Sequence, residues 1–116
     1  MYEYRARVIH VVDGDTLDLD VSLGFHVQIK GRFRLLGLNT PESFGPDACD
    51  AGRAAKAWVQ ETLPEGTEVI VQTRRDAGDK YGRYLAVVLL NGQSVNDALV
   101  SAGHAKPYDG HGVKPV

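Results

Sequence analysis

The sequence predicts a mainly β fold with helices (α+β), in the form of a five-stranded OB-fold β-barrel. Three observations support this prediction. Short alternating or β-branched runs recur along a chain of 116 residues, one segment between them has helical periodicity, and no linker-like stretch divides the chain. The order of three strands, a helix and two strands is that of an OB barrel with a helix between strands 3 and 4. We therefore expect a single domain over residues 1–116, with an irregular tail over 104–116.

The first two strands are predicted to form a hairpin. Residues 3–12 include the β-branched run Val8-Ile9-His10-Val11-Val12, and Asp13-Gly14 supplies a turn. In the next segment apolar residues alternate with polar ones, at Leu17, Leu19, Val21 and Leu23. Asp15 shares the parity of these apolar residues. Its carboxylate is therefore expected to point inward at the end of the sheet, where a buried acid needs a partner.

A third strand is expected from about Phe25 to Leu38, with Gly31 marking a bulge or a bend. In this strand Arg34 faces away from Phe33 and Leu35. This placement predicts a partly buried guanidinium group, which must find an anion or hydrogen-bond acceptors.

The second half of the chain is predicted to add two helices and two strands. After a loop over 43–48, one helical stripe precedes the stop signals Pro64 and Gly66, and it consists of Ala51, Ala54, Ala55, Trp58, Val59 and Thr62. Strands are expected over 67–73 and 83–90, separated by the polar loop 74–82. A short C-terminal helix over 95–102 ends at Gly103.

Composition narrows the class of protein. The single cysteine, Cys49, cannot form an internal disulfide, which is compatible with a reducing compartment. No apolar run approaches the roughly 20 residues of a membrane span, and no signal peptide is evident, so we expect a cytoplasmic or otherwise intracellular protein unless the chain is a processed form. A net charge of −2 argues against indiscriminate coating of nucleic acid, so any such binding is expected to be local.

One group of polar residues suits a hard metal ion. Asp15, Asn39 and the carbonyl of Thr40 offer a carboxylate, an amide oxygen and a backbone oxygen, which are ligands that Ca²⁺ prefers. Glu42 would then be near enough to orient or deprotonate a water molecule. The structural alternative is that Thr40 caps a helix, with Pro41 in its first turn, and that Asp15 only completes a hairpin turn.

Two arginines suit a phosphodiester substrate. Arg34 and Arg83 could stabilise the charge that accumulates on phosphate oxygens in the transition state. Lys80 and Tyr81 precede Arg83 in a glycine-containing loop and could hold a neighbouring phosphate, while Tyr108 could stack on a base. The alternative is that these residues belong to ordinary solvated surface.

These motifs, in this order and spacing, resemble the staphylococcal nuclease (thermonuclease) family. The similarity covers about residues 6–106. The matching segments are Asp13-Gly14-Asp15-Thr16, Phe33-Arg34-Leu35-Leu36 through Thr40-Pro41-Glu42, Asp79-Lys80-Tyr81-Gly82-Arg83 and Val95-Asn96-Asp97-Ala98-Leu99-Val100.

The resemblance implies a calcium-dependent nuclease that cuts DNA and RNA, single-stranded or locally melted, with little sequence specificity and leaves 3′-phosphates. It implies that Asp15 and the Thr40 carbonyl bind Ca²⁺, and that Glu42 orients or activates the attacking water. Arg34 and Arg83 would hold the scissile phosphate, and Lys80 and Tyr81 a neighbouring one. We expect a monomer without a membrane partner.

One departure from the family pattern concerns the metal. Asn39 stands where the best-known member has a second metal-binding aspartate, so we expect weaker metal binding. The main alternative function is a catalytically weak or inactive OB-fold module that binds nucleic acid or a protein partner. A further alternative is an unrelated OB scaffold, in which these motifs are only turns and caps.

Overall fold

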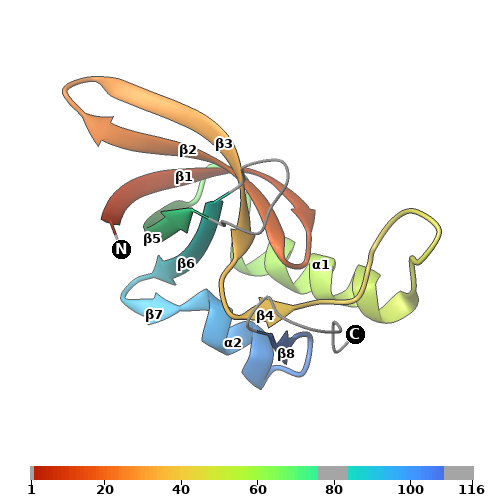
Figure 1. The fold of residues 1–116 in the computed structure, drawn as a ribbon. Helices are drawn as coiled ribbons and strands as arrows, with labels where there is room; N and C mark the ends of the chain where they lie inside the picture. Colours follow the sequence, from red (N-terminus) through yellow and green to blue (C-terminus); the bar gives the residue numbers. More distant parts are fainter. Residues whose placement is uncertain (1, 76–83, 109–116) are drawn as a thin grey trace.

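A computed structural model describes residues 2–75 and 84–108 as a closed barrel of five strands with two helices (Figure 1). The barrel strands are β1 (Tyr2–Asp13), β2 (Thr16–Gly24), β3 (Val27–Leu35), β5 (Glu68–Arg75) and β6 (Tyr84–Leu90). They pair in the order β3-β2-β1-β5-β6, and a parallel pairing of Phe33–Leu35 with Tyr84–Ala86 closes the barrel. The predicted OB-type fold is confirmed.

Helices and short strands flank the barrel. Helix α1 (Asp50–Thr62) follows β4 (Leu38–Asn39), and helix α2 (Val95–Ser101) follows β7 (Gln93–Ser94). The last described strand, β8 (Lys106–Pro107), pairs with β4. Neither α1 nor α2, the helices of the described residues, is long and apolar enough to cross a membrane.

The barrel interior follows the alternation of the sequence. Leu17 and Leu19 of β2 are fully buried, as are Val71 and Val88 on the opposite strands. Each fully buried side chain of this size stabilises the fold by about 1.5–3 kcal/mol. Helix α1 contributes Ala55 and Val59, so the core continues from the barrel to the helix.

The third strand ends earlier than predicted. Instead of running to Leu38, the chain turns at Leu36–Gly37 and resumes as β4. Gly37 has a φ of +83°, and the carbonyl of Leu36 accepts a hydrogen bond from the buried Asn96 side chain at 3.0 Å. The predicted bulge at Gly31 is wrong, because the β2–β3 register is regular there.

The β2–β3 hairpin extends beyond the barrel (Figure 1). Its two-residue turn is Phe25–His26, with φ values of +55° and +64°, which is the requirement of a type I′ turn. Non-glycine residues are strained in this region, and Asn-Gly is the preferred pair. The β6–β7 hairpin follows this preference with Asn91-Gly92.

Replacing Phe25-His26 by Asn-Gly is expected to stabilise the protein. Relief of backbone strain should raise the free energy of unfolding by about 1–2 kcal/mol and the melting temperature by about 5 °C. Thermal and urea denaturation measure both quantities. The reverse change, Asn91→Phe, serves as the matched control and should lower the melting temperature of the protein. If the Asn-Gly variant melted below the parent, the conclusion that the Phe25-His26 turn is strained would be wrong.

Residues 104–108, where we expected irregular chain, are docked against the start of β4. Asn39 pairs with Lys106, and the backbone N–H of Tyr108 donates to the Gly37 carbonyl at 2.9 Å. Ala105 is buried. The segment therefore supports the short strand that carries Asn39.

Candidate functional site

Asp15 lies in the tight β1–β2 turn, and its carboxylate points inward as predicted. The residue is only 8% exposed, and its backbone carbonyl accepts a hydrogen bond from the Leu35 N–H at 2.8 Å. Its Oδ1 accepts from the Thr16 hydroxyl at 3.0 Å, and its Oδ2 accepts from the Thr40 N–H at 3.4 Å. These contacts fix the carboxylate between the ends of β2, β3 and β4.

Gly14 allows this close approach. A Cβ atom at this position would lie 2.9 Å from Thr40 Oγ1 and 3.0 Å from the Ala55 side chain. Both distances are shorter than ordinary van der Waals contact. A glycine before Asp15 therefore brings the turn against Thr40 and helix α1.

Asn39 and Thr40 follow as the second part of the site, and both are 2% exposed. The Asn39 amide nitrogen donates to the Thr40 carbonyl at 3.3 Å. The Thr40 hydroxyl is buried and has no hydrogen-bond partner among the described residues. A buried hydroxyl that lacks a partner is unusual and indicates a place where a further polar group binds.

This donor set fits a hard cation. It consists of the Asp15 carboxylate, the Asn39 amide and the Thr40 carbonyl, whose oxygens are ligand types that Ca²⁺ takes. The 3.3 Å contact joins the Asn39 amide nitrogen to the Thr40 carbonyl, and it keeps these two groups together. Its formal charge is only −1, from Asp15. Consistently, the described residues contain no cluster of three or more His, Cys, Asp or Glu side chains that could hold a metal ion.

Arg34 lies next to the carboxylate, at the end of β3. Its Nη2 is 4.0 Å from Asp15 Oδ2, and its side chain is 20% exposed. The prediction of a partly buried guanidinium beside an anion is confirmed. Asp15 places a negative charge near the guanidinium without a hydrogen bond to it, and the exposed fraction leaves the group accessible to a second anion such as a phosphate.

Glu42 is exposed, and its backbone is held by the start of helix α1. Its carbonyl accepts from the Cys49 N–H at 3.1 Å, and a Cβ atom on Gly52 would lie 1.8 Å from the same oxygen. Helix α1 begins at Asp50 with Cys49 as its N-cap, so the alternative that Thr40 caps a helix is wrong. Thr40 and Glu42 instead belong to a non-helical segment between β4 and α1.

Of the remaining predicted site residues, the structure describes Tyr108 alone. Tyr108 lies beside the Gly37 turn. Lys80, Tyr81 and Arg83 lie outside the described residues.

Two other arginines near the site are already paired. Arg32 forms an ion pair with Asp18 at 2.9 Å, and this hydrogen bond raises the pKa of the Arg32 guanidinium above its ordinary value. Arg53 pairs with Asp50 at the start of α1. Both pairs are exposed, so they add little stability, but they make these two arginines poorer phosphate ligands than Arg34.

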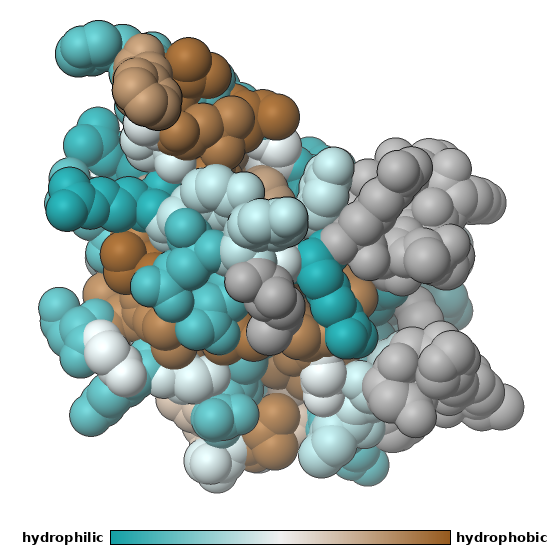
Figure 2. All heavy atoms as spheres, turned by 60° about the vertical axis from the view of Figure 1, so that its left-hand side comes forward, coloured by the Kyte–Doolittle hydropathy of each residue, from teal (hydrophilic) through white to brown (hydrophobic). Residues whose placement is uncertain are grey.

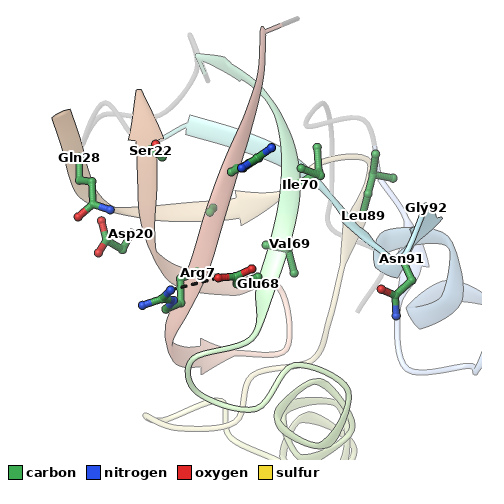
Figure 3. A pocket seen from close by; sticks show the side chains of 12 residues that line it. Arg7, Asp20, Ser22, Gln28, Glu68, Val69, Ile70, Leu89, Asn91 and Gly92 are labelled. Atoms are coloured by element: carbon green, nitrogen blue, oxygen red, sulfur yellow. Dashed lines mark hydrogen bonds and ion pairs between the residues drawn. The ribbon is translucent and has the colours of Figure 1, made fainter. Parts of the chain in front are cut away.

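Two hollows lie among residues 2–75 and 84–108. A groove of about 490 Å³ on the outer face of β1, β2 and β5 is spanned by the Arg7–Glu68 ion pair, and no predicted site residue that the structure describes lines it (Figure 3). A depression of about 410 Å³ lies next to the site, between Pro41, the start of α1 and Lys106. Ala51 and Ala54 of the predicted helical stripe are exposed and line this depression instead of the core.

Sequence reasoning assigned no structural role to two supporting residues, although Asn96 was part of a family-matching segment. Asn96 accepts from the Val88 N–H and donates to the carbonyls of Ala86 and Leu36, each at 3.0 Å, so it ties α2 to the turn before β4. Gly52 permits helix α1 to touch the Glu42 backbone. For Asn96, the only sequence signal of such a role is a polar residue in the first turn of a predicted helix. For Gly52, the signal is a glycine inside a predicted helix, which often marks a close backbone contact.

A comparison with protein-family models matches residues 32–114 of the chain to the family described as "Staphylococcal nuclease homologue". The chain belongs to the staphylococcal nuclease family. The matched range contains Arg34, Asn39, Thr40 and Glu42, and Asp15 lies before it.

Curated relatives support this membership in the nuclease family. The chain is 34% identical over 101 residues to the thermonuclease of Staphylococcus intermedius, covering 85% of this chain and 56% of that protein. It is 32% identical over 97 residues to endonuclease YncB of Bacillus subtilis, covering 82% and 44%, and 32% identical over 114 residues to endonuclease YhcR of the same organism, covering 91% and 9%. The chain therefore spans little more than half the length of these relatives at most.

Proposed function

We propose that this chain is a calcium-dependent nuclease that hydrolyses phosphodiester bonds of DNA and RNA with little sequence specificity and leaves 3′-phosphates. The observation that carries the proposal is the convergence of Asp15, Arg34 and the Asn39–Thr40 pair at one end of the barrel, in a member of the nuclease family. The relatives named as nucleases support the reaction class.

In this proposal Asp15, the Asn39 amide oxygen and the Thr40 carbonyl hold the Ca²⁺ ion. When bound, the ion supplies electrostatic stabilisation of the phosphate and a template for its orientation. The protein prepares the donors in advance, because Asp15 is fixed by Thr16 and by the Thr40 backbone. The Asn39 backbone is fixed by its strand pairing with Lys106.

Arg34 and Glu42 have complementary roles. The Arg34 guanidinium binds the scissile phosphate through its accessible face and stabilises the charge that develops on the phosphate oxygens. The Glu42 carboxylate orients a water molecule and accepts its proton as the water oxygen attacks phosphorus. The bond from phosphorus to the 5′ oxygen breaks, the leaving oxygen takes up a proton from solvent to form a 5′ hydroxyl, and the phosphate stays on the 3′ side.

The remaining predicted residues extend the substrate contacts. Arg83 is proposed to hold the scissile phosphate together with Arg34, and Lys80 and Tyr81 a neighbouring phosphate. The depression beside Pro41 offers space next to the site for a nucleotide of a single-stranded or locally melted chain. Tyr108, docked on the Gly37 turn, is proposed to stack on a base.

One observation favours a second candidate function. The metal donors include a single carboxylate, so the site attracts a cation less strongly than a pair of carboxylates would. A catalytically weak or inactive OB-fold module that binds nucleic acid or a protein partner would tolerate such a site. The two functions predict different results when a negative charge is added at position 39. A nuclease should cleave at lower Ca²⁺ concentration, whereas a binding module should still not cleave.

Asn39→Asp is therefore expected to strengthen the response to calcium. A second carboxylate should lower the half-saturating Ca²⁺ concentration for cleavage of single-stranded DNA by about tenfold. In the calcium-free protein Asn39→Asp adds a second buried carboxylate to the end of the barrel that holds Asp15, so the variant should also melt at a lower temperature without Ca²⁺ and gain more from its addition. Cleavage against Ca²⁺ concentration and melting with and without Ca²⁺ measure both effects.

The matched control is Asn91→Asp, the same change in the exposed β6–β7 turn, which should leave both calcium responses unaltered. Absence of cleavage at every Ca²⁺ concentration, in the parent and in Asn39→Asp alike, would reject the nuclease and leave the binding module. Equal activity in a calcium chelator would reject the metal requirement.

A further inference from the structure

The far end of the β2–β3 hairpin, residues 23–29, concentrates exposed apolar side chains, and we call it the hairpin tip. Seven large apolar side chains are exposed among the described residues, and four of them belong to the tip: Leu23, Phe25, Val27 and Ile29. Phe25 is 96% exposed, and the other three are 44–51% exposed. Single exposed apolar residues are ordinary, but a contiguous group marks a surface that binds a partner. Figure 2 shows the apolar side chains gathered on the hairpin at the top of the view.

The turn holds Phe25 in water at a cost in backbone strain. Phe25 and His26 both have positive φ, although the same chain uses Asn91-Gly92 for its other two-residue hairpin turn. The same preference would place small polar residues at the outermost point of this hairpin. A strained backbone that presents an aromatic side chain instead indicates a functional reason for that side chain.

The hairpin tip projects into solvent instead of enclosing a space. It lies at the end of the hairpin away from the barrel (Figure 1), and none of its four apolar residues lines either of the two hollows described above. A projecting tip has to be received by its partner. A lipid bilayer does this without a matching pocket, because its interface takes up apolar side chains to a depth of about 5–10 Å.

The charges behind the tip favour an anionic surface. Between positions 21 and 33 the chain has His26, Lys30 and Arg32 and no acidic residue, although the whole chain has a net charge of −2. Asp18 and Asp20 lie closer to the barrel on β2, and Asp18 pairs with Arg32. Lys30 is opposite Asp20 in the strand register but forms no ion pair within the described residues. It is therefore available to an anionic lipid head group.

We propose that the hairpin tip binds a lipid bilayer that contains anionic head groups. Leu23 and Val27 lie within two residues of Phe25, about 7 Å along a strand, so these three side chains fit within the depth of the interface. Lys30 lies further from the tip, and its long side chain reaches the head groups while its stem packs on apolar surface. The inference replaces the expectation that the protein has no membrane partner, and it depends on the fold and the surface, not on the proposed nuclease activity.

This orientation leaves the candidate site free. Arg34 lies nine residues along the chain from Phe25, near the other end of β3, which corresponds to up to about 30 Å of extended strand. A nucleic acid can therefore reach Arg34 while the tip is in the bilayer. We expect vesicle binding and cleavage to vary independently of each other.

Co-sedimentation with vesicles of phosphatidylcholine and about one quarter phosphatidylserine tests the proposal, without nucleic acid and without Ca²⁺. The parent should bind, and Phe25→Ser should weaken binding by about tenfold or more. Lys30→Gln should weaken it about fivefold on these vesicles and leave binding to pure phosphatidylcholine unchanged. The control Phe44→Ser removes another exposed aromatic side chain, outside the hairpin, and should bind like the parent.

Two further variants separate vesicle binding from folding. The Asn-Gly replacement of Phe25-His26 should melt above the parent and yet bind vesicles at least about tenfold more weakly. Phe25→Cys in a Cys49→Ser background, labelled with an environment-sensitive fluorophore, should gain fluorescence when vesicles are added, because the label enters the interface. Phe44→Cys, labelled in the same background, should not.

A parent that binds no vesicles at any lipid concentration, or binding that is unchanged in Phe25→Ser, would overturn the proposal. Oligo(dT) binding that depends on Phe25, in a parent that ignores vesicles, would overturn it in favour of a single strand stacked on this ring. A parent that binds vesicles through Phe25 but cleaves no DNA would support the lipid site and reject the proposed nuclease alone.

Discussion

Glu42→Gln is expected to reduce the rate of single-stranded DNA cleavage by about 10²–10⁴-fold. The amide keeps the size and polarity of the side chain but cannot accept a proton from water. Because Glu42 is exposed, the substitution should leave the melting temperature within about 2 °C of the parent. Initial rates at saturating Ca²⁺, together with a thermal melt, separate a loss of chemistry from a loss of fold.

Glu61→Gln is the matched control for this prediction. Glu61 is an exposed glutamate near the C-terminal end of helix α1, so the same chemical change there should not alter the cleavage rate. If Glu42→Gln retained full activity, the proposed base would be wrong, and the attacking water would have to lose its proton by another route.

Gly52→Ala is expected to be the most destabilising single change. The added Cβ would lie 1.8 Å from the Glu42 carbonyl oxygen and 2.3 Å from the carbonyl carbon, so backbone atoms must move. We expect the free energy of unfolding to fall by about 3 kcal/mol or more, and the melting temperature by roughly 10 °C or more. This clash outweighs the gain in helix propensity that Ala normally brings, about 1 kcal/mol.

Gly31→Ala tests whether the effect comes from the clash. At Gly31 the added Cβ would meet only Phe33, at 3.5 Å, an ordinary contact. Its φ is not in the positive range, so Gly31→Ala should change stability by less than about 1 kcal/mol. Equal stability of Gly52→Ala and the parent in urea denaturation would mean that α1 does not need to touch the Glu42 backbone.

The barrel could be predicted because its strands carry their signals locally. The alternation of Leu17, Leu19 and Val21 indicates both a strand and its inner face, and the same parity placed Asp15 inward. Parity also placed Arg34 on the face opposite Phe33 and Leu35. The closeness of Asp15 and Arg34 followed from these two local patterns and the barrel topology.

Features that depend on contacts between distant segments could not be predicted in this way. The turn at Leu36–Gly37 is hidden in an apolar run and is fixed by Asn96, which comes from helix α2. The pairing of Asn39 with Lys106 joins two-residue strands, too short to give a period. At the hairpin tip, Gly24 suggested the turn, but the strained positions belong to Phe25 and His26.

The strand carrying Asn39 has its partner near the end of the described chain, at Lys106–Pro107. Likewise, β3 closes the barrel only against β6, and Asn96 must be present to fix the turn at Leu36. The N-terminal third of the chain contains every described donor of the proposed metal site, yet it cannot hold them in place alone. During synthesis, then, the site cannot assemble before Lys106 and Pro107 have left the ribosome, long after Asp15, Asn39 and Thr40 have emerged.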